Sequence, residues 1–236
     1  MGSKARLSKE ISPIINKLIN DNNVLLYIEP FVGGANMIQH VKCDKKIGSD
    51  SNEYLIAMWN SIKKGWIPPE ELSKDTYNEI KNNKESYEKD LVAVTGFCAT
   101  YNAKWFGGYA GVVNTKIGTT RNYYDEAVRN ILKQKEYIED VDFINYDYRD
   151  FSNIENALIY CDPPYANTTK YGNDKDFNHD EFWDWVRKVS ENNIVLVSEY
   201  NAPDEFEVIY EKELTTTLDK NSRKKDIERL FKLRNT

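Results

Sequence analysis

The chain has 236 residues, 40% hydrophobic and 30% charged, which suits one large domain or one domain with an insertion, and it has no apolar run near the ~18 residues that would suggest a transmembrane helix. Its formal net charge of -6 argues against a simple nonspecific nucleic-acid-binding protein, although a local basic cleft remains compatible with it. Three scattered cysteines and two histidines favour a reduced, cytoplasmic protein without a metal centre or a His-based catalytic triad.

The front of the chain has the pattern of a nucleotide-binding βαβ unit. We predict a helix over 8–20, a buried strand over 24–28, a strand over 46–49 and a helix from 52 to about 65. Between the strands, Glu29-Pro30-Phe31-Val32-Gly33-Gly34-Ala35 forms a glycine turn that we expect to lead into a helix ending near Val41. By itself this glycine pair fits an ordinary tight turn equally well. Asp50 ends the second strand, about 20 residues after the turn, where an acidic residue can bind ribose hydroxyls.

Residues 67–140 interrupt the α/β alternation, and we interpret them as an inserted, mainly helical subdomain. Helical pieces are expected over 71–89, and a helix opens at Arg121 and continues through Leu132. The stretch 101–111 is rich in aromatic residues and glycine, and we interpret it as a loop or hairpin outside the core.

The alternation then resumes. The predicted elements are strands over 141–148, 157–161 and 194–198, a helix over 180–191, and an edge hairpin from strands over 206–211 and 229–233. The predicted fold class is therefore α/β, a Rossmann-like, mostly parallel sheet with helices on both faces. Residues 1–66 and 141–236 would form its main domain, and residues 67–140 the insertion.

The most informative stretch is 156–165, which reads Asn-Ala-Leu-Ile-Tyr-Cys-Asp-Pro-Pro-Tyr. An apolar strand runs into Asp162, and Pro163 and Pro164 then end the ladder because neither can donate a backbone hydrogen bond. The Asp162 carboxylate and the Pro163 carbonyl are two acceptors that would satisfy an exocyclic amine, and Tyr165 offers a flat face for a base. The alternative is a strand-ending turn, in which Asp and Pro are common.

Several segments lie along the chain in a characteristic order. They are Gly2-Ser3-Lys4, Glu29 to Ala35, Asp50-Ser51-Asn52, Lys104-Trp105-Phe106-Gly107-Gly108-Tyr109, Tyr160 to Tyr165, Ser198-Glu199-Tyr200-Asn201-Ala202-Pro203 and Glu228-Arg229-Leu230-Phe231. In these segments the chain resembles the D12 class of DNA adenine-N6 methyltransferases, the Dam-like family, and its short phage and bacterial members in particular. The resemblance covers essentially the whole chain, and the order of the motifs is more specific than any one of them.

The resemblance implies a class I methyltransferase fold and site-specific methyl transfer from S-adenosylmethionine to N6 of a flipped-out adenine in double-stranded DNA. It implies that the donor site comprises Lys4, Glu29, Pro30, Phe31, Gly33, Gly34, Asp50, Asp147, Tyr148 and Asp162. Lys4 would lie near the methionine carboxylate, Asp50 at the ribose, and Asp147 and Tyr148 beside the adenine. The implied catalytic residues are Asp162, Pro163, Pro164 and Tyr165.

Double-stranded DNA is the implied partner, and the sequence leaves the oligomeric state open, a monomer being compatible with it. The candidate DNA contacts are Lys104, Trp105, Tyr109, Lys116 and Arg121, with Trp105 or Phe106 as a wedge beside the flipped base. These aromatic residues could equally pack the insertion, and the basic ones could be ordinary solvated side chains. The basic residues Arg223, Lys224 and Lys225 are further candidates for phosphate contacts, and the polar stretch 167–178 could close over the target base or be a surface loop.

Two departures from the family pattern affect these expectations. An aromatic residue often precedes the Gly-Ser-Lys element, where this chain has Met1. The GATC-specific members carry a hairpin with a Phe-Asn-Val-Pro-like stretch, whereas residues 112–119 here read Val-Val-Asn-Thr-Lys-Ile-Gly-Thr, so GATC is not the expected target. A methyltransferase acting on RNA or on a protein amide, and a non-catalytic DNA-binding module, are the alternative functions. Asp rather than Asn or Ser before Pro-Pro-Tyr disfavours the first, and donor binding would disfavour the second.

Overall fold

The computed structural model describes residue 4 and residues 6–114, 118–165, 177–219 and 222–234, with the backbone alone for 214–219 and 222–226. Seven strands form one sheet in the order β5-β2-β1-β6-β7-β9-β8. They are β1 (Leu26–Glu29), β2 (Lys45–Ser49), β5 (Val141–Ile144), β6 (Ala157–Cys161), β7 (Ile194–Glu199), β8 (Phe206–Asp219) and β9 (Ser222–Leu233). The first five run parallel to one another, and β9 is antiparallel to both β7 and β8.

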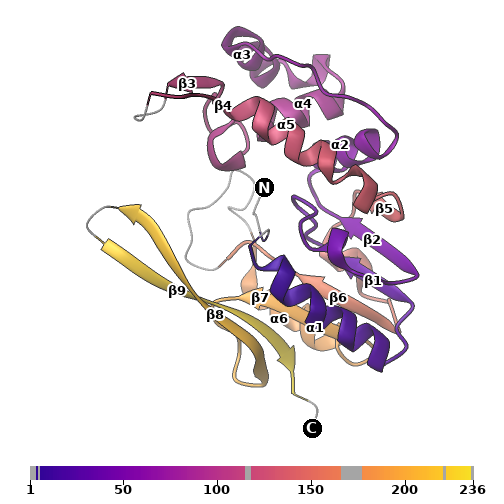
Figure 1. The fold of residues 1–236 in the computed structure, drawn as a ribbon. Helices are drawn as coiled ribbons and strands as arrows, with labels where there is room; N and C mark the ends of the chain where they lie inside the picture. Colours follow the sequence, from indigo (N-terminus) through magenta and orange to yellow (C-terminus); the bar gives the residue numbers. More distant parts are fainter. Residues whose placement is uncertain (1–3, 5, 115–117, 166–176, 220–221, 235–236) are drawn as a thin grey trace.

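Helices cover both faces of this sheet. The helices are α1 (Ser8–Asp21), α2 (Glu53–Lys63), α3 (Lys74–Asn82), α4 (Lys89–Cys98), α5 (Tyr123–Lys133) and α6 (His179–Val189). In Figure 1, α1 lies in front of the sheet and α6 behind it. Strand β6 is buried along its whole length, with Leu158 and Tyr160 in the same core as α1, and Ile159 and Cys161 in the core around α6. The prediction of a mostly parallel α/β sheet with helices on both faces is confirmed (Figure 1).

Residues between α2 and β5 form a helical part that Figure 1 places above the sheet. It contains α3, α4, α5, the short 3-10 helix η3 (Tyr101–Ala103) and the hairpin of β3 (Val112–Asn114) and β4 (Thr120–Asn122). The expectation that 101–111 lies outside the core is wrong in part, because Phe106 and Ala110 are 7% and 0% exposed. Gly96 on α4 is the reason: a Cβ there would lie 2.4 Å from the Trp105 ring, so only glycine lets the loop approach this closely.

Three further elements differ from the sequence-based expectation. The glycine turn leads only into the 3-10 helix η1 (Ile38–His40), since the left-handed backbone at Gly33 and Ala35 extends the turn and leaves few residues for a helix. Strand β5 ends at Ile144, because the Asp147 side chain caps the 3-10 helix η5 (Tyr148–Phe151) by accepting from the Arg149 amide. Strands β8 and β9 are also much longer than predicted, at 14 and 12 residues.

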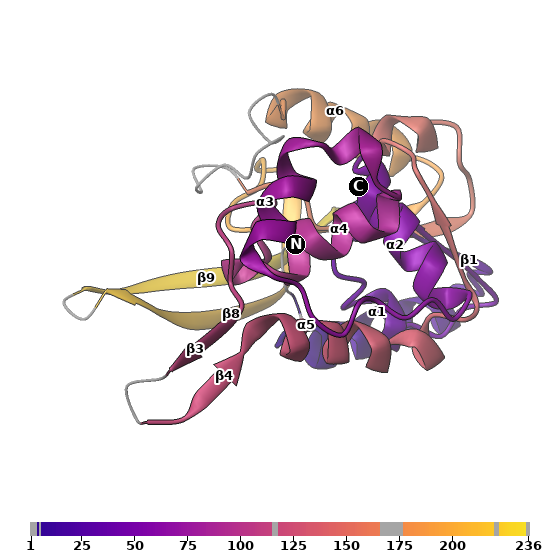
Figure 2. The ribbon, with the colours of Figure 1, turned by 90° about the horizontal axis from the view of Figure 1, so that it is seen from above.

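The β8–β9 and β3–β4 hairpins both project beyond the body of the molecule. Figures 1 and 2 show them extending towards the same side, one from the sheet and the other from the helical part. Among the described residues, no helix is both long and apolar enough to cross a membrane.

Candidate active site

Acidic residues gather where the parallel strands end. Glu29 and Glu199 are the last residues of β1 and β7, Asp50 and Asp162 directly follow β2 and β6, and Asp147 lies shortly after β5. Since the carboxyl ends of parallel strands share one edge of the sheet, the topology places these five groups along the same edge. Open α/β sheets bind their ligands there.

The glycine turn after β1 is fixed on one side and open on the other. Trp59, fully buried on α2, donates from Nε1 to the Gly33 carbonyl at 2.9 Å. The Asp50 carboxylate accepts from the Gly33 and Asn52 amides at 3.2 and 3.0 Å. A Cβ at Gly33 would meet only the Phe31 carbonyl oxygen, at 3.9 Å, and the φ of +46° there is one that L side chains rarely adopt. The turn therefore leaves room for a ligand beside Gly33.

The other residues of the turn join it to its surroundings. Pro30 is buried, and the Gly34 carbonyl accepts from Gln134 at 3.1 Å. The half-buried Phe31 ring is stacked on Tyr148 at a centroid distance of 5.6 Å. Asp147, whose carboxylate is paired with Arg149 at 2.6 Å, precedes Tyr148. The structure thus brings Phe31, Tyr148 and Asp147 together beside the glycine turn.

A second cluster forms around Asp162 at the end of β6. Lys4 lies among its acceptors, with Nζ 3.4 Å from Asp162 Oδ1 and hydrogen bonds to the Tyr165 hydroxyl and to Glu228. The Lys4 ammonium lies 4.5 Å from the centroid of the Tyr165 ring, and the Tyr165 hydroxyl donates to Glu228 Oε1 at 2.7 Å. Pro163 is buried and Pro164 is half-buried, so both hold the backbone between Asp162 and Tyr165.

Burial shapes the electrostatics of this edge. It raises the pKa of Glu29 to about 8; the hydrogen bond from Tyr27, at 2.6 Å, opposes that effect and the negative charge of Asp162 adds to it. Burial also raises the pKa of Asp162, with Lys4 favouring the charged form and Glu228 opposing it. Several carboxylates therefore compete for protons and cations in a small volume, which is a common property of functional sites.

The far wall of the cluster comes from β7 and β9. The Tyr200 ring meets the Tyr165 ring edge to face, with centroids 4.8 Å apart. The Tyr200 amide donates to Glu199 Oε1 at 2.8 Å, and Arg229 donates to the Tyr200 carbonyl at 2.6 Å. The two tyrosine rings thus form an aromatic corner whose backbone is held from both strands.

The candidate DNA contacts occupy different environments. Trp105 is half-buried, with ring centroids 4.6 Å from Phe97 and 4.7 Å from Phe106, and the Tyr109 hydroxyl donates to the Leu72 carbonyl at 2.7 Å. These contacts match the packing alternative, and DNA contact by Trp105 and Tyr109 stays a prediction. Lys104 is half-buried. The exposed Arg121 forms a bidentate pair with Glu126 and lies over the Tyr123 ring at 4.5 Å, whereas Lys116 and the stretch 166–176 lie outside the described residues.

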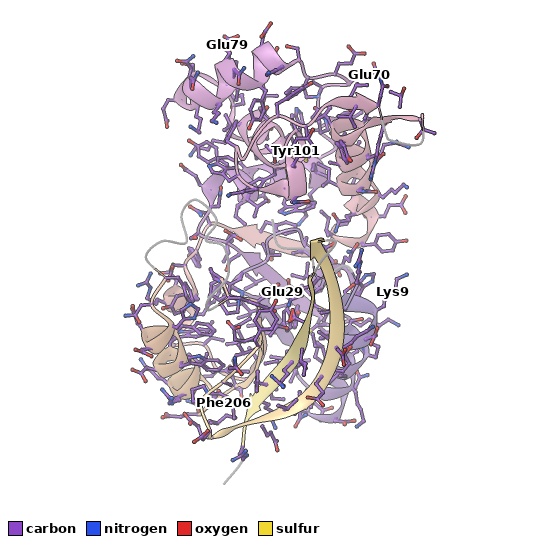
Figure 3. The ribbon with its side chains drawn as sticks, turned by 90° about the vertical axis from the view of Figure 1, so that its left-hand side faces the viewer. Lys9, Glu29, Glu70, Glu79, Tyr101 and Phe206 are labelled. Carbon is purple, nitrogen blue, oxygen red and sulfur yellow. The ribbon has the colours of Figure 1, made fainter. Side chains whose placement is uncertain are left out.

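Two residues of this region were not singled out from the sequence. Glu228 was predicted only as part of a motif, and the sequence around it, Glu-Arg-Leu-Phe-Lys-Leu over 228–233, does not indicate that its carboxylate is buried. Tyr101 is 49% exposed and precedes Asn102 and Ala103, both with left-handed backbone. Such strain in non-glycine residues is concentrated at functional sites. Figure 3 shows Tyr101 in the helical part and Glu29 in the sheet-containing part below it.

The sheet order and this edge are those of a class I methyltransferase. Residues 1–217 match the model of the D12 class N6 adenine-specific DNA methyltransferases, and the chain belongs to this family.

Three relatives illustrate the range of the family. The chain is 26% identical over 207 residues to the type II methyltransferase M.FokI of Planomicrobium okeanokoites, covering 79% of this chain and 31% of that protein. It is 28% identical over 198 residues to the modification methylase StsI of Streptococcus sanguinis, covering 74% and 29%. It is 24% identical over 254 residues to the type II methyltransferase M.MjaIII of Methanocaldococcus jannaschii, covering 89% and 86%. The chain thus spans about a third of the length of the first two relatives.

Proposed function

We propose that this protein transfers a methyl group from S-adenosylmethionine to N6 of an adenine flipped out of double-stranded DNA, at a specific sequence and in the cytoplasm of a bacterial cell. The observation that carries the proposal is the arrangement of Asp162, Pro163 and Tyr165 beside the open turn at Gly33, within a chain of the D12 family. The carboxylate and the aromatic ring would hold the base, and the turn would hold the donor.

The residues beside the turn fit S-adenosylmethionine, which supplies an electrophilic methyl group on a sulfonium sulfur. The space beside Gly33 admits the methionine part, and Asp50 is placed for the ribose hydroxyls. The half-buried Phe31 ring would give an apolar surface for the adenine, supported from behind by the buried Tyr148, with Asp147 next to them. Lys4 is the cation for the methionine carboxylate, towards which it would turn from its present contacts with Asp162 and Glu228.

Asp162, the Pro163 carbonyl and Tyr165 would act on the target base. Accepting both hydrogens of the N6 amine favours a tetrahedral nitrogen and stabilises the positive charge that develops on it. Stacking on Tyr165 returns roughly 1–3 kcal/mol of the few kcal/mol that base flipping costs. The position of Lys4 supports this assignment. Its ammonium is a cationic nitrogen that contacts the Asp162 carboxylate and the Tyr165 ring, as the positively charged N6 would. No strong base is needed, since the methylated ammonium loses its proton readily.

We assign DNA recognition to the insertion, residues 67–140. Lys104, Lys116 and Arg121 are the proposed phosphate or base contacts, and Tyr101 is an exposed aromatic side chain proposed as a wedge. The projection of the β3–β4 and β8–β9 hairpins towards one side supports a DNA path between them (Figure 2). The basic residues of segment 223–225 would meet phosphates near the tip of the second hairpin.

The test is N6-methyladenine in genomic DNA from cells that lack other adenine methyltransferases, read by single-molecule sequencing. Wild type and Glu207→Gln, a change of an exposed β8 carboxylate, should methylate one short motif, and Asp162→Ala should methylate none. Methylation in every sequence context would refute target recognition by the insertion. Absence of N6-methyladenine with folded, donor-binding wild type would refute DNA as substrate and favour RNA or protein.

A further inference from the structure

Glu228 is a buried carboxylate on the strand that lies between β7 and β8. Its side chain is 8% exposed, and β9 pairs with β7 through the neighbouring residues Arg229 and Glu199. From this inner position Glu228 reaches Tyr165 at the carboxyl edge, accepting from its hydroxyl at 2.7 Å, and it also pairs with Lys4. One carboxylate on β9 thus contacts two groups of the site, Tyr165 and Lys4.

We propose that Glu228 is a positioning residue for methyl transfer: it fixes the Tyr165 ring for stacking on the target base and holds Lys4 at the entrance to the donor site. The inference deepens the proposed function and rests on it. Tyr165 follows two prolines, its ring meets Tyr200 edge to face, and its hydroxyl donates to Glu228, so the hydrogen bond to Glu228 helps to set the rotation and tilt of the ring.

The local charges argue against a purely structural role. A buried carboxylate is costly, and here it lies beside another one, since the negative charge of Glu228 opposes ionisation of Asp162. A glutamine would also accept the Tyr165 hydroxyl without that repulsion. A negative charge at Glu228 is explained if it must hold Lys4 in this corner until the methionine carboxylate of S-adenosylmethionine binds.

The pH dependence of the reaction rate should report the charge of Glu228. The titratable groups that act on Asp162 come from the N-terminal segment (Lys4), from the loop after β6 (Tyr165) and from β9 (Glu228), and Glu29 of β1 is coupled to it as well. Loss of the Glu228 charge removes a repulsion between this side chain and Asp162. That change lowers the pKa of Asp162, so the acid limb of the rate profile should move to lower pH.

The experiment compares wild type, Glu228→Gln, Glu228→Ala and the matched control Glu207→Gln on a duplex that contains the methylated motif. We expect Glu228→Ala to lower kcat/KM for DNA by about tenfold to a hundredfold, the effect of losing one hydrogen bond to a charged group. Glu228→Gln should move the acid limb to lower pH, and Glu207→Gln should change neither quantity. Wild-type rates and an unmoved acid limb in folded Glu228→Gln would overturn the inference.

A measurement without catalysis separates this inference from the proposed function. In urea unfolding, Tyr165→Phe and Glu228→Ala each remove the hydrogen bond between these two side chains, so the double variant should lose less stability than the two single losses added together. Additive losses would overturn the pairing. If wild type fails to methylate any DNA, the proposed function is refuted. The comparison of the single and double variants in urea then still decides whether Glu228 positions Tyr165.

Discussion

Replacing Glu29 with glutamine should remove a large pH dependence from the stability of the protein. Glu29 is 2% exposed, and burial raises its pKa from an ordinary 4.5 to about 8. The native state therefore binds this proton more tightly than the unfolded state, so the stability it contributes is fully present below pH 4.5 and is lost as the pH rises to about 8. A difference of about 3.5 pH units corresponds to about 5 kcal/mol at 1.36 kcal/mol per unit.

Urea unfolding of wild type and Glu29→Gln between pH 5 and pH 9 measures this effect. Glutamine keeps an acceptor for the Tyr27 hydroxyl, so the difference in unfolding free energy between the two proteins isolates the ionisation. Relative to the variant, wild type should lose about 4 kcal/mol between pH 5 and pH 8 and little above that. The control Glu207→Gln should follow wild type throughout. A difference that stays constant within about 0.5 kcal/mol over this range would refute the reasoning, because Glu29 would then be ionised in the native state.

Three further outcomes are expected. Gly96→Ala places a Cβ 2.4 Å from the Trp105 ring and should lower the unfolding free energy by about 1–3 kcal/mol, as measured by urea titration. Gly33→Ala faces open space but keeps a φ of +46°, so it should cost about 1–2 kcal/mol in the same assay and weaken S-adenosylmethionine binding in calorimetry. Tyr101→Ala should reduce the fluorescence rise of 2-aminopurine at the target position, whereas Tyr137→Ala, a change of another exposed tyrosine, should not; equal effects would contradict the wedge assignment.

Much of the sheet was predictable because its strands are buried on both faces. Apolar runs such as 24–28 and 194–198 admit few other structures, and the two prolines after Asp162 mark where β6 ends. The β8–β9 hairpin was underestimated, since its outer half lacks an apolar run and follows from strand pairing that local sequence does not encode. The inward packing of Trp105, which lies in a loop, likewise depends on a single glycine, Gly96 on helix α4.

The acidic edge was predictable in outline and not in its connections. Acids at the ends of parallel strands lie along one edge of the sheet, so the position of Asp50 and Asp162 at that edge could be predicted from the sequence. The contacts of Lys4 with Glu228 required knowing that β9 enters the sheet beside β7, a consequence of antiparallel pairing over a long sequence separation. Tyr101 was not predicted as a site residue because the same loop contains several other aromatic residues, and the sequence does not distinguish which of them is exposed.

The place of β9 in the sheet has a consequence for synthesis on the ribosome. The parallel strands β1, β2, β5, β6 and β7 all leave the ribosome before β9, whereas β8 joins the sheet only through β9. Lys4 and Glu228, 224 positions apart, can therefore meet only when translation has passed the last strand. A nascent chain can thus form the parallel part of its sheet early, while the corner made by Lys4, Tyr165 and Glu228, to which we assign base binding, is completed last.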